Sequence, residues 1–308
     1  TGRARPRWRR PVALGLGALL LVGALLIWRT APLPTARWRV ERITVTGLFD
    51  SGVQRSGKGR FEIIDCDLNA YEAPVKAFDS TDSAGEAECI ILNGLHTGFN
   101  SKSTSIGIYI HPNVSFLCSG THYKNFNRFA FYANGTPGND PKYFTVTDVE
   151  VEDCSLAQTA SGAHPVFTRV FHHGVNPTPG EGLIKGDATF VDCDLRPSGS
   201  TGLMQGDHEV TYVNCWIEPQ RIFLSAGVNT TGTFRFVNCH WKLENVDARA
   251  LNMTGGWSGR VVFLDSIIND CGTTSGPYLV QINGGTVDFA SLTIDTPASA
   301  PIICTTPG

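Results

Sequence analysis

The chain lacks several patterns that would assign it a chemistry. Its nine cysteines are widely spaced, since the nearest two, Cys193 and Cys215, are 22 positions apart, whereas a structural zinc site places its cysteines in close pairs. No G-x-S-x-G nucleophile motif and no glycine-rich phosphate-binding loop occurs. These absences leave no sequence signature of a cysteine zinc site, a serine hydrolase or a nucleotide-binding enzyme.

Basic residues are scarce outside the N-terminal part. Residues 1–60 hold 12 Lys and Arg against two acids, a balance of +10, although the whole chain carries a formal charge of −3. The remainder therefore carries −13, which is −3 minus +10. We do not expect nucleic acid as a partner, because phosphate recognition relies on basic surface. Neutral or cationic ligands fit this charge better. We expect no cofactor and no metal site, with calcium as the alternative that the acids leave open.

An uncharged segment follows the basic N-terminus. Residues 11–28 span 18 positions without a charge, about 27 Å as a helix, which is close to the thickness of the bilayer core. We expect residues 1–10 to be a basic cytoplasmic tail, 11–28 a transmembrane signal anchor, and 29–60 a juxtamembrane linker, with the body outside the cell membrane. The alternative is a signal peptide cleaved near Ala36, which would give a secreted protein.

The linker carries one resemblance of its own. Its segment WRVERITVTGLF, from Trp38 to Phe49, resembles the first strand of the POTRA domain in single-span bacterial division proteins of the FtsQ type. No αβ region of POTRA size follows, because repeat sequence begins by Phe61. We expect a juxtamembrane strand here and transfer no function from that family.

From Phe61 onward, one eight-residue pattern recurs. It is apolar or small at positions 1 and 3, Asp, Asn or Ser at position 5, and apolar at position 8. The copies are FEIIDCDL (61–68), VEVEDCSL (149–156), ATFVDCDL (188–195), VTYVNCWI (210–217), FRFVNCHW (234–241), VVFLDSII (261–268) and VDFASLTI (287–294). The last five copies follow one another at intervals of 22 to 27 residues, and such a period with strand-like alternation is typical of a solenoid. Helical periodicity and the leucine pattern of leucine-rich repeats are missing, so the sequence predicts an all-β parallel β-helix over residues 61–308.

The pattern also resembles the pectin-lyase-like right-handed parallel β-helix superfamily, over roughly residues 61–300. A coil of that family often reads apolar-x-apolar-x-Asn-Cys-x-apolar, with Asn at a bend between two strands, where successive Asn side chains form a hydrogen-bonded ladder. Asn and Asp also tolerate the left-handed backbone that a sharp bend needs. We therefore expect a structural ladder of Asp65, Asp153, Asp192, Asn214, Asn238 and Asp265.

Cysteine occupies position 6 of five copies. Alternation after the bend turns these side chains inward, and stacked parallel side chains do not converge as a disulfide requires. We expect free, buried thiols at Cys66, Cys154, Cys193, Cys215 and Cys239. Four cysteines outside this register are better disulfide candidates in an exported protein, namely Cys89, Cys118, Cys271 and Cys304.

Another strand of each coil ends in Gly. Its copies are RIFLSAG (221–227), ARALNMTGG (248–256) and PYLVQINGG (277–285), with GLMQG (202–206) and PVFTRVFHHG (165–174) as earlier counterparts. The resemblance implies that this is the first strand of the coil, on whose face the enzymes of the superfamily bind sugar chains. We expect its outward residues to form one substrate-binding column, flanked by Asp207: Arg169, His173, Gln205, Ser225, Asn252 and Gln281.

Two functions fit such a column, because amides and a guanidinium suit hydroxyl-rich ligands. One is a non-catalytic envelope β-helix that binds a glycan or cell-surface polymer. The other is a polysaccharide lyase or glycoside hydrolase, in which His173 would be the proton-transfer candidate. Hydrolases normally use two carboxylates, and none pair on this column, so binding is favoured. An ordinary solvated sheet face remains the alternative to both.

An apolar stripe precedes the bend. Val191, Val213, Val237 and Leu264 should point outward, and a stripe of this kind on consecutive coils is usually covered. A loop, a terminal segment or a neighbouring subunit of a homo-oligomer would cover it.

Overall fold

The computed structural model describes most of the chain from Arg37 onward. Its regular elements are all strands, and no helix in the described part is long and apolar enough to cross a membrane. The transmembrane helix expected over residues 11–28 lies outside the described residues and stays a prediction. The described ranges are 37–47, 50–56, 59–78, 87–99, 103–111, 114–133, 143–159, 163–175, 183–198, 202–204, 208–220, 222–226, 231–244, 249–253, 257–270, 280–282, 284–295 and 303–305.

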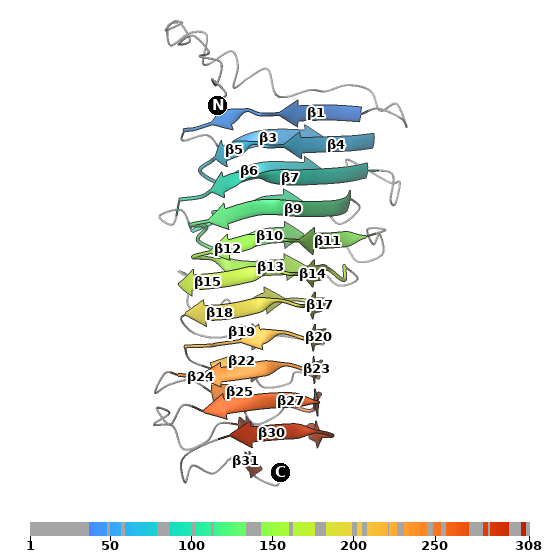
Figure 1. The fold of residues 1–308 in the computed structure, drawn as a ribbon. Coiled ribbons are helices and arrows are strands. Elements are labelled where there is room, and N and C mark those ends of the chain that lie inside the picture. The colour runs from blue at the N-terminus through green and yellow to red at the C-terminus, as the bar shows by residue number, and fades with distance from the viewer. Residues whose placement is uncertain are drawn as a thin grey trace, which may run out of the picture.

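The strands form one parallel β-solenoid, an elongated stack of coils that runs from the N-terminal to the C-terminal end (Figure 1). Each strand pairs in parallel with its counterpart in the next coil, as β17, β20, β23 and β26 do in sequence. A coil contributes up to three strands, so the strands line up in three columns. The predicted parallel β-helix is therefore confirmed as an architecture.

The bounds of the strands follow the columns. The first column contains β1 (Arg37–Glu41), β4 (Gly59–Ile64), β7 (Ala87–Thr97), β9 (Val114–Lys124), β11 (Phe144–Thr147), β14 (Val166–Thr168), β17 (Ala188–Val191), β20 (Glu209–Val213), β23 (Thr233–Val237), β26 (Arg260–Leu264) and β29 (Thr286–Phe289). The second contains β2 (Thr44–Val45), β5 (Asp67–Asn69), the later halves of β7 and β9, β12 (Glu150–Glu152), β15 (Phe171–Val175), β18 (Asp194–Ser198), β21 (Trp216–Ile217), β24 (His240–Leu243), β27 (Ser266–Asp270) and β30 (Leu292–Asp295). The third contains β3 (Ser51–Ser56), β6 (Ala73–Phe78), β8 (Ile108–Ile110), β10 (Phe129–Ala133), β13 (Ser155–Thr159) and β16 (Ile184–Lys185), followed by a separate sheet of β19 (Gly202–Met204), β22 (Ile222–Ala226), β25 (Arg249–Met253), β28 (Val280–Ile282) and β31 (Ile303–Thr305).

The first two columns meet at a bend with a left-handed central residue. The φ angle there is 49° to 58° at Asp65, Asn93, Asp148, Arg169, Asp192, Asn214, Asn238 and Asp265. Bend side chains bond one another between coils, since Asn214 Nδ2 donates to Asp192 Oδ1 at 3.1 Å and Asn238 Nδ2 donates to Asn214 Oδ1 at 2.9 Å. Short polar side chains thus satisfy a strained backbone and tie neighbouring coils together.

Asp153 takes a different place from the other predicted ladder residues. Its φ of 55° is also left-handed, but it follows β12 and lies at the next bend of its coil. Asp148 stands in the ladder position of that coil, where it pairs with Arg169 of the following one. Asp148 and Asp153 are five positions apart, and each follows a strand with alternating apolar residues. The eight-residue pattern therefore matched the bend at Asp153 instead of the bend at Asp148.

The core contains a continuous aromatic stack along the first column. Position 3 of the repeat points inward, and Phe190, Tyr212, Phe236 and Phe263 follow one another there in register. Adjacent ring centroids are 4.8 Å, 4.9 Å and 5.2 Å apart, with interplanar angles of 8°, 8° and 19°. Each such pair contributes roughly 0.5–1.5 kcal/mol beyond its buried area, which holds coils in register.

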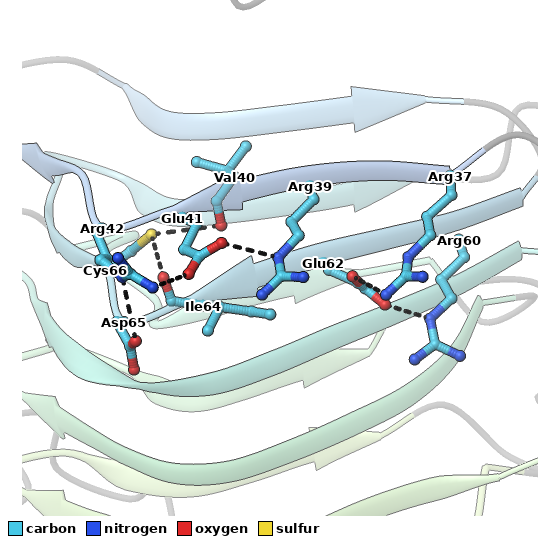
Figure 2. A network of polar contacts seen from close by, with 10 residues as sticks. All are labelled: Arg37, Arg39, Val40, Glu41, Arg42, Arg60, Glu62, Ile64, Asp65 and Cys66. Atoms are coloured by element: carbon cyan, nitrogen blue, oxygen red, sulfur yellow. Dashed lines mark hydrogen bonds and ion pairs between the residues drawn. The ribbon is translucent and has the colours of Figure 1, made fainter.

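The solenoid begins before the predicted boundary at residue 61. β1 pairs in parallel with β4, so the segment expected to be linker and juxtamembrane strand belongs to the first coil. Figure 2 shows how charges fix this pairing: Glu62 is buried between Arg37, at 2.8 Å, and Arg60, at 2.6 Å. The Arg37 hydrogen bond, opposed by burial and assisted by Arg60, lowers the pKa of Glu62. Arg37 and Arg60 therefore stabilise the fold, in addition to any role in membrane orientation.

The cysteines of the described core are free thiols. Cys66, Cys89, Cys118, Cys154, Cys193, Cys215 and Cys239 are all buried and unbridged. The disulfide expectation is therefore wrong for Cys89 and Cys118, which lie in adjacent strands but are offset, since Cys89 pairs with Phe116 and Cys118 with Ile91. Burial raises the pKa of Cys118 to about 11, which keeps it protonated at neutral pH.

Candidate functional site

The third column carries part of the predicted binding residues. Ser225, Asn252 and Gln281 are paired in register on β22, β25 and β28. Their side chains lie outside the described residues, as do Gln205 and Asp207. Ser225 pairs with Leu203 rather than with Gln205. The sequence alignment of β19 with β22 was therefore displaced by two residues. A displacement of two residues leaves the same face of a strand outward.

Arg169 does not belong to that column. It occupies the bend after β14 with a φ of 51°, and its guanidinium makes a bidentate pair with Asp148 at 2.6 Å and 2.8 Å. The hydrogen bonds and charge of Asp148 raise the pKa of Arg169. Residues 165–174 are thus a copy of the bend repeat with Arg in place of Asp, and the expectation that they form the sugar-binding strand is wrong.

His173 lies on yet another face. It belongs to β15 in the second column, where its Nε2 is 2.9 Å from Glu150 Oε1 and its ring stacks on Phe171 with centroids 4.4 Å apart. Its neighbour His172 points inward and is buried. The predicted column of Arg169, His173, Ser225 and Asn252 therefore does not exist as one surface.

A different set of side chains is aligned on the N-terminal half of the third column. Strand register pairs Lys76 with Tyr109, Tyr109 with Tyr132, Tyr132 with Gln158, and Gln158 with Lys185. All five are partly exposed, whereas their neighbours along each strand, such as Ile108, Ile110 and Phe131, are buried. We call Lys76, Tyr109, Tyr132, Gln158 and Lys185 the tyrosine face.

Two aromatic rings form the centre of the tyrosine face. The centroids of Tyr109 and Tyr132 are 5.4 Å apart, with the rings tilted by 34°. Burial, together with the neighbouring Tyr132, raises the pKa of Tyr109, so its hydroxyl stays protonated at neutral pH and can both donate and accept hydrogen bonds.

Cations surround these rings. The Arg128 guanidinium carbon is 5.6 Å from the Tyr132 ring centroid, and its NH2 group donates to Gln158 Oε1 at 3.4 Å. Lys185 Nζ lies 5.6 Å from the Phe129 ring centroid. Lys76 is paired with Glu72 at 2.8 Å. The face therefore combines aromatic surface, amide and hydroxyl groups, and local positive charge.

The sequence contains only a weak pattern that could have indicated the tyrosine face. IYI (108–110) and FYA (131–133) show an aromatic residue on the polar side of an alternating strand. These coils do not match the eight-residue pattern, so sequence alone did not place their strands in a column. Only the pairing of β8 with β6 and β10 brings the residues together.

The described part of the chain is thus an elongated β-solenoid that carries the tyrosine face on one side and charged residues at its bends. Neither feature repeats a known catalytic arrangement. Comparison of the chain with protein-family models, with curated proteins and with solved structures gave no match.

Proposed function

We propose that the chain binds an acidic, hydroxyl-rich polysaccharide along the tyrosine face, without cleaving it. The observation that carries this proposal is the unbroken strand register from Lys76 through Tyr109, Tyr132 and Gln158 to Lys185. Parallel strands are spaced by about 4.8 Å, so each coil offers one new contact to a polymer that runs along the stack.

The residue types fit such a ligand chemically. Tyrosine presents an amphipathic ring at low entropic cost, because it has few rotatable bonds, and its hydroxyl can bond a sugar hydroxyl. Gln158 offers both a donor and an acceptor, and the nearby Arg128 and Lys185 can pair with carboxylates of sugar acids. The acidic remainder of the protein opposes an anionic ligand only weakly, because charges beyond about 8 Å are screened at physiological salt.

Binding is favoured over hydrolysis by the placement of carboxylates. The five residues of the tyrosine face include no acid, and Glu72 beside them is paired with Lys76. On the second column, Glu152 is unsuited to acid catalysis, which needs a raised pKa. Burial raises the pKa of Glu152, but Lys124, His173 and His122 lower it further, so the net shift is downward.

The N-terminal segment would decide where this binding occurs. An anchor over residues 11–28 would hold the tyrosine face outside the cell membrane, where polysaccharides are found. Retention of the full-length protein in membranes through a carbonate wash would support that placement, whereas release would indicate a secreted form.

Affinity electrophoresis in gels that contain polygalacturonate or neutral dextran tests the binding proposal. The double variant Tyr109→Ala/Tyr132→Ala should bind polygalacturonate roughly ten-fold to hundred-fold more weakly, since two aromatic contacts contribute about 1–3 kcal/mol together. Tyr132→Phe should bind nearly normally, and Lys185→Gln should weaken binding to the acidic polymer alone.

The matched control is Trp216→Ala, which removes a partly exposed aromatic ring from the second column, where it lies 4.5 Å from His240. It should bind like the wild type. Unchanged binding by the double tyrosine variant would refute the proposed site. Shortened polymer or unsaturated chain ends after incubation would refute the non-catalytic function.

A further inference from the structure

The outward side of the second column gathers imidazole and carboxylate groups on three consecutive strands. His122 of β9 pairs in register with Glu150 of β12, while Glu152 of β12 pairs with His173 of β15. Residues in register on neighbouring parallel strands point to the same side and lie about 4.8 Å apart. This cluster is separate from the tyrosine face and independent of the function proposed for it.

The distances within the cluster are short. His122 Nε2 lies 3.2 Å from Glu152 Oε2, and His122 Nδ1 lies 3.9 Å from Glu150 Oε2. One ligand atom from each of His122, Glu150 and Glu152 falls within 4.8 Å of the other two. Tetrahedral zinc separates its ligand atoms by roughly 3.4 Å, which small side-chain rotations can reach from here.

One nitrogen of the cluster lies beside a carboxylate without forming a hydrogen bond to it. His122 Nε2 is buried yet has no hydrogen-bond partner among the described residues, although a carboxylate oxygen is 3.2 Å away. A buried polar nitrogen without a hydrogen-bond partner costs stability. A cation between the nitrogen and the two carboxylates would satisfy it.

The remaining neighbours hold the carboxylates in place. Lys124 Nζ binds Glu152 Oε1 at 2.7 Å, which leaves Oε2 directed toward His122. His173 Nε2 holds Glu150 Oε1 at 2.9 Å, which leaves Oε2 on the His122 side. Partners of this kind orient metal-binding carboxylates and raise metal affinity.

We propose that His122, Glu150 and Glu152 bind a divalent zinc ion, with Lys124 and His173 as the positioning residues. An imidazole nitrogen with two carboxylates is a ligand set for zinc, whereas calcium and magnesium take oxygen ligands. The three side chains are 30%, 42% and 21% exposed, so solvent or a ligand can occupy the fourth position.

Calorimetric titration of the full-length, chelator-treated protein with zinc chloride tests this site. The wild type should bind one zinc ion, and His122→Ala and Glu152→Gln should each weaken binding at least about 100-fold. His173→Phe, which removes only an orienting contact, should weaken it roughly ten-fold. Calcium chloride should give no binding at the same site.

Matched controls lie on β24 of the same column and directly after its strand β21. His240→Ala and Glu218→Gln remove a histidine and a carboxylate outside the cluster and should leave zinc binding unchanged. Circular dichroism checks each fold, and Glu150→Gln serves as the second carboxylate variant if Glu152→Gln fails to fold. Cobalt(II) substitution then identifies the ligand type, because a thiolate band would place the metal on cysteine.

The expected result is one zinc ion, lost in the His122 and carboxylate variants and retained in both controls, with no thiolate band. Absence of zinc binding by the wild type, undiminished binding by the ligand variants, or a cobalt–thiolate band would each overturn the proposal.

Discussion

Two buried histidines should make the solenoid sensitive to mild acid. His96 and His172 are 0% and 2% exposed, and both occupy the inward column of the second strand. Burial lowers the pKa of His96 to about 3. Burial also lowers the pKa of His172 to about 4, against the opposing hydrogen bond to the Cys154 carbonyl and with a smaller contribution from His173.

The direction in which stability changes with pH follows from proton linkage. Both pKa values lie below the unfolded value of about 6.5, so the unfolded chain takes up protons first as the pH falls. Stability is then complete above pH 6.5 and is lost progressively toward the folded pKa values of about 3 and about 4. At pH 5 each histidine should have removed about 2 kcal/mol from the free energy of unfolding, or ~4 kcal/mol together.

The neighbours in register supply matched replacements. His96 follows Leu68 in its inward column, and His172 precedes Leu195. The double variant His96→Leu/His172→Leu should therefore pack in the same column but lose the titration. Urea denaturation between pH 8 and pH 5, followed by the fluorescence of the buried Trp241 and Trp257, measures both proteins.

The wild type should lose ~4 kcal/mol over this range, and the double variant should lose much less. The comparison depends on the slope with pH, so a different absolute stability of the variant does not affect it. An equally steep fall in both proteins would refute the assignment of acid sensitivity to these two side chains.

Three further predictions concern the repeat itself. Cys193, Cys215 and Cys239 are buried free thiols and should resist alkylation until the protein is denatured without reductant; rapid reaction of the folded protein would contradict this. Cys215→Ser should cost only about 1 kcal/mol, because Ser266 already fills this position and donates to a strand carbonyl at 3.1 Å, whereas Cys215→Arg should prevent folding by burying an unpaired charge. The paired outward residues Val191, Val213, Val237 and Leu264 remain a proposed homo-oligomer surface. Val213→Glu/Val237→Glu should dissociate or destabilise the protein in sedimentation experiments, and wild-type behaviour would rule that surface out.

The sequence could place most of the coils that carry Asp-Cys or Asn-Cys. At Asp192, Asn214 and Asn238 the left-handed backbone and the side-chain ladder occur where the repeat predicts them. It could not place Asp153 or Arg169, because the same alternation of apolar residues surrounds both bends of a coil. Only the pairing of β11 with β9 and β14 shows that Asp148 is the ladder residue there.

The candidate sites were the least predictable part of the molecule. Tyr109 and Tyr132 are 23 positions apart, and His122 and Glu152 are 30 apart, in coils with loops of unequal length. Spacing alone therefore did not align them, and the predicted column mixed residues from two faces and a bend.

What the sequence determined by itself was the class of fold. A recurring alternation with a bend residue requires that each coil bury its apolar side against the next, and this holds whatever the loops contain. The tertiary structure decided which outward residues became neighbours, because register between parallel strands is set by packing of the inward side chains of adjacent coils. The repeat aligns Phe190, Tyr212 and Phe236 at one position, but only the structure shows that their rings stack and hold adjacent coils in register.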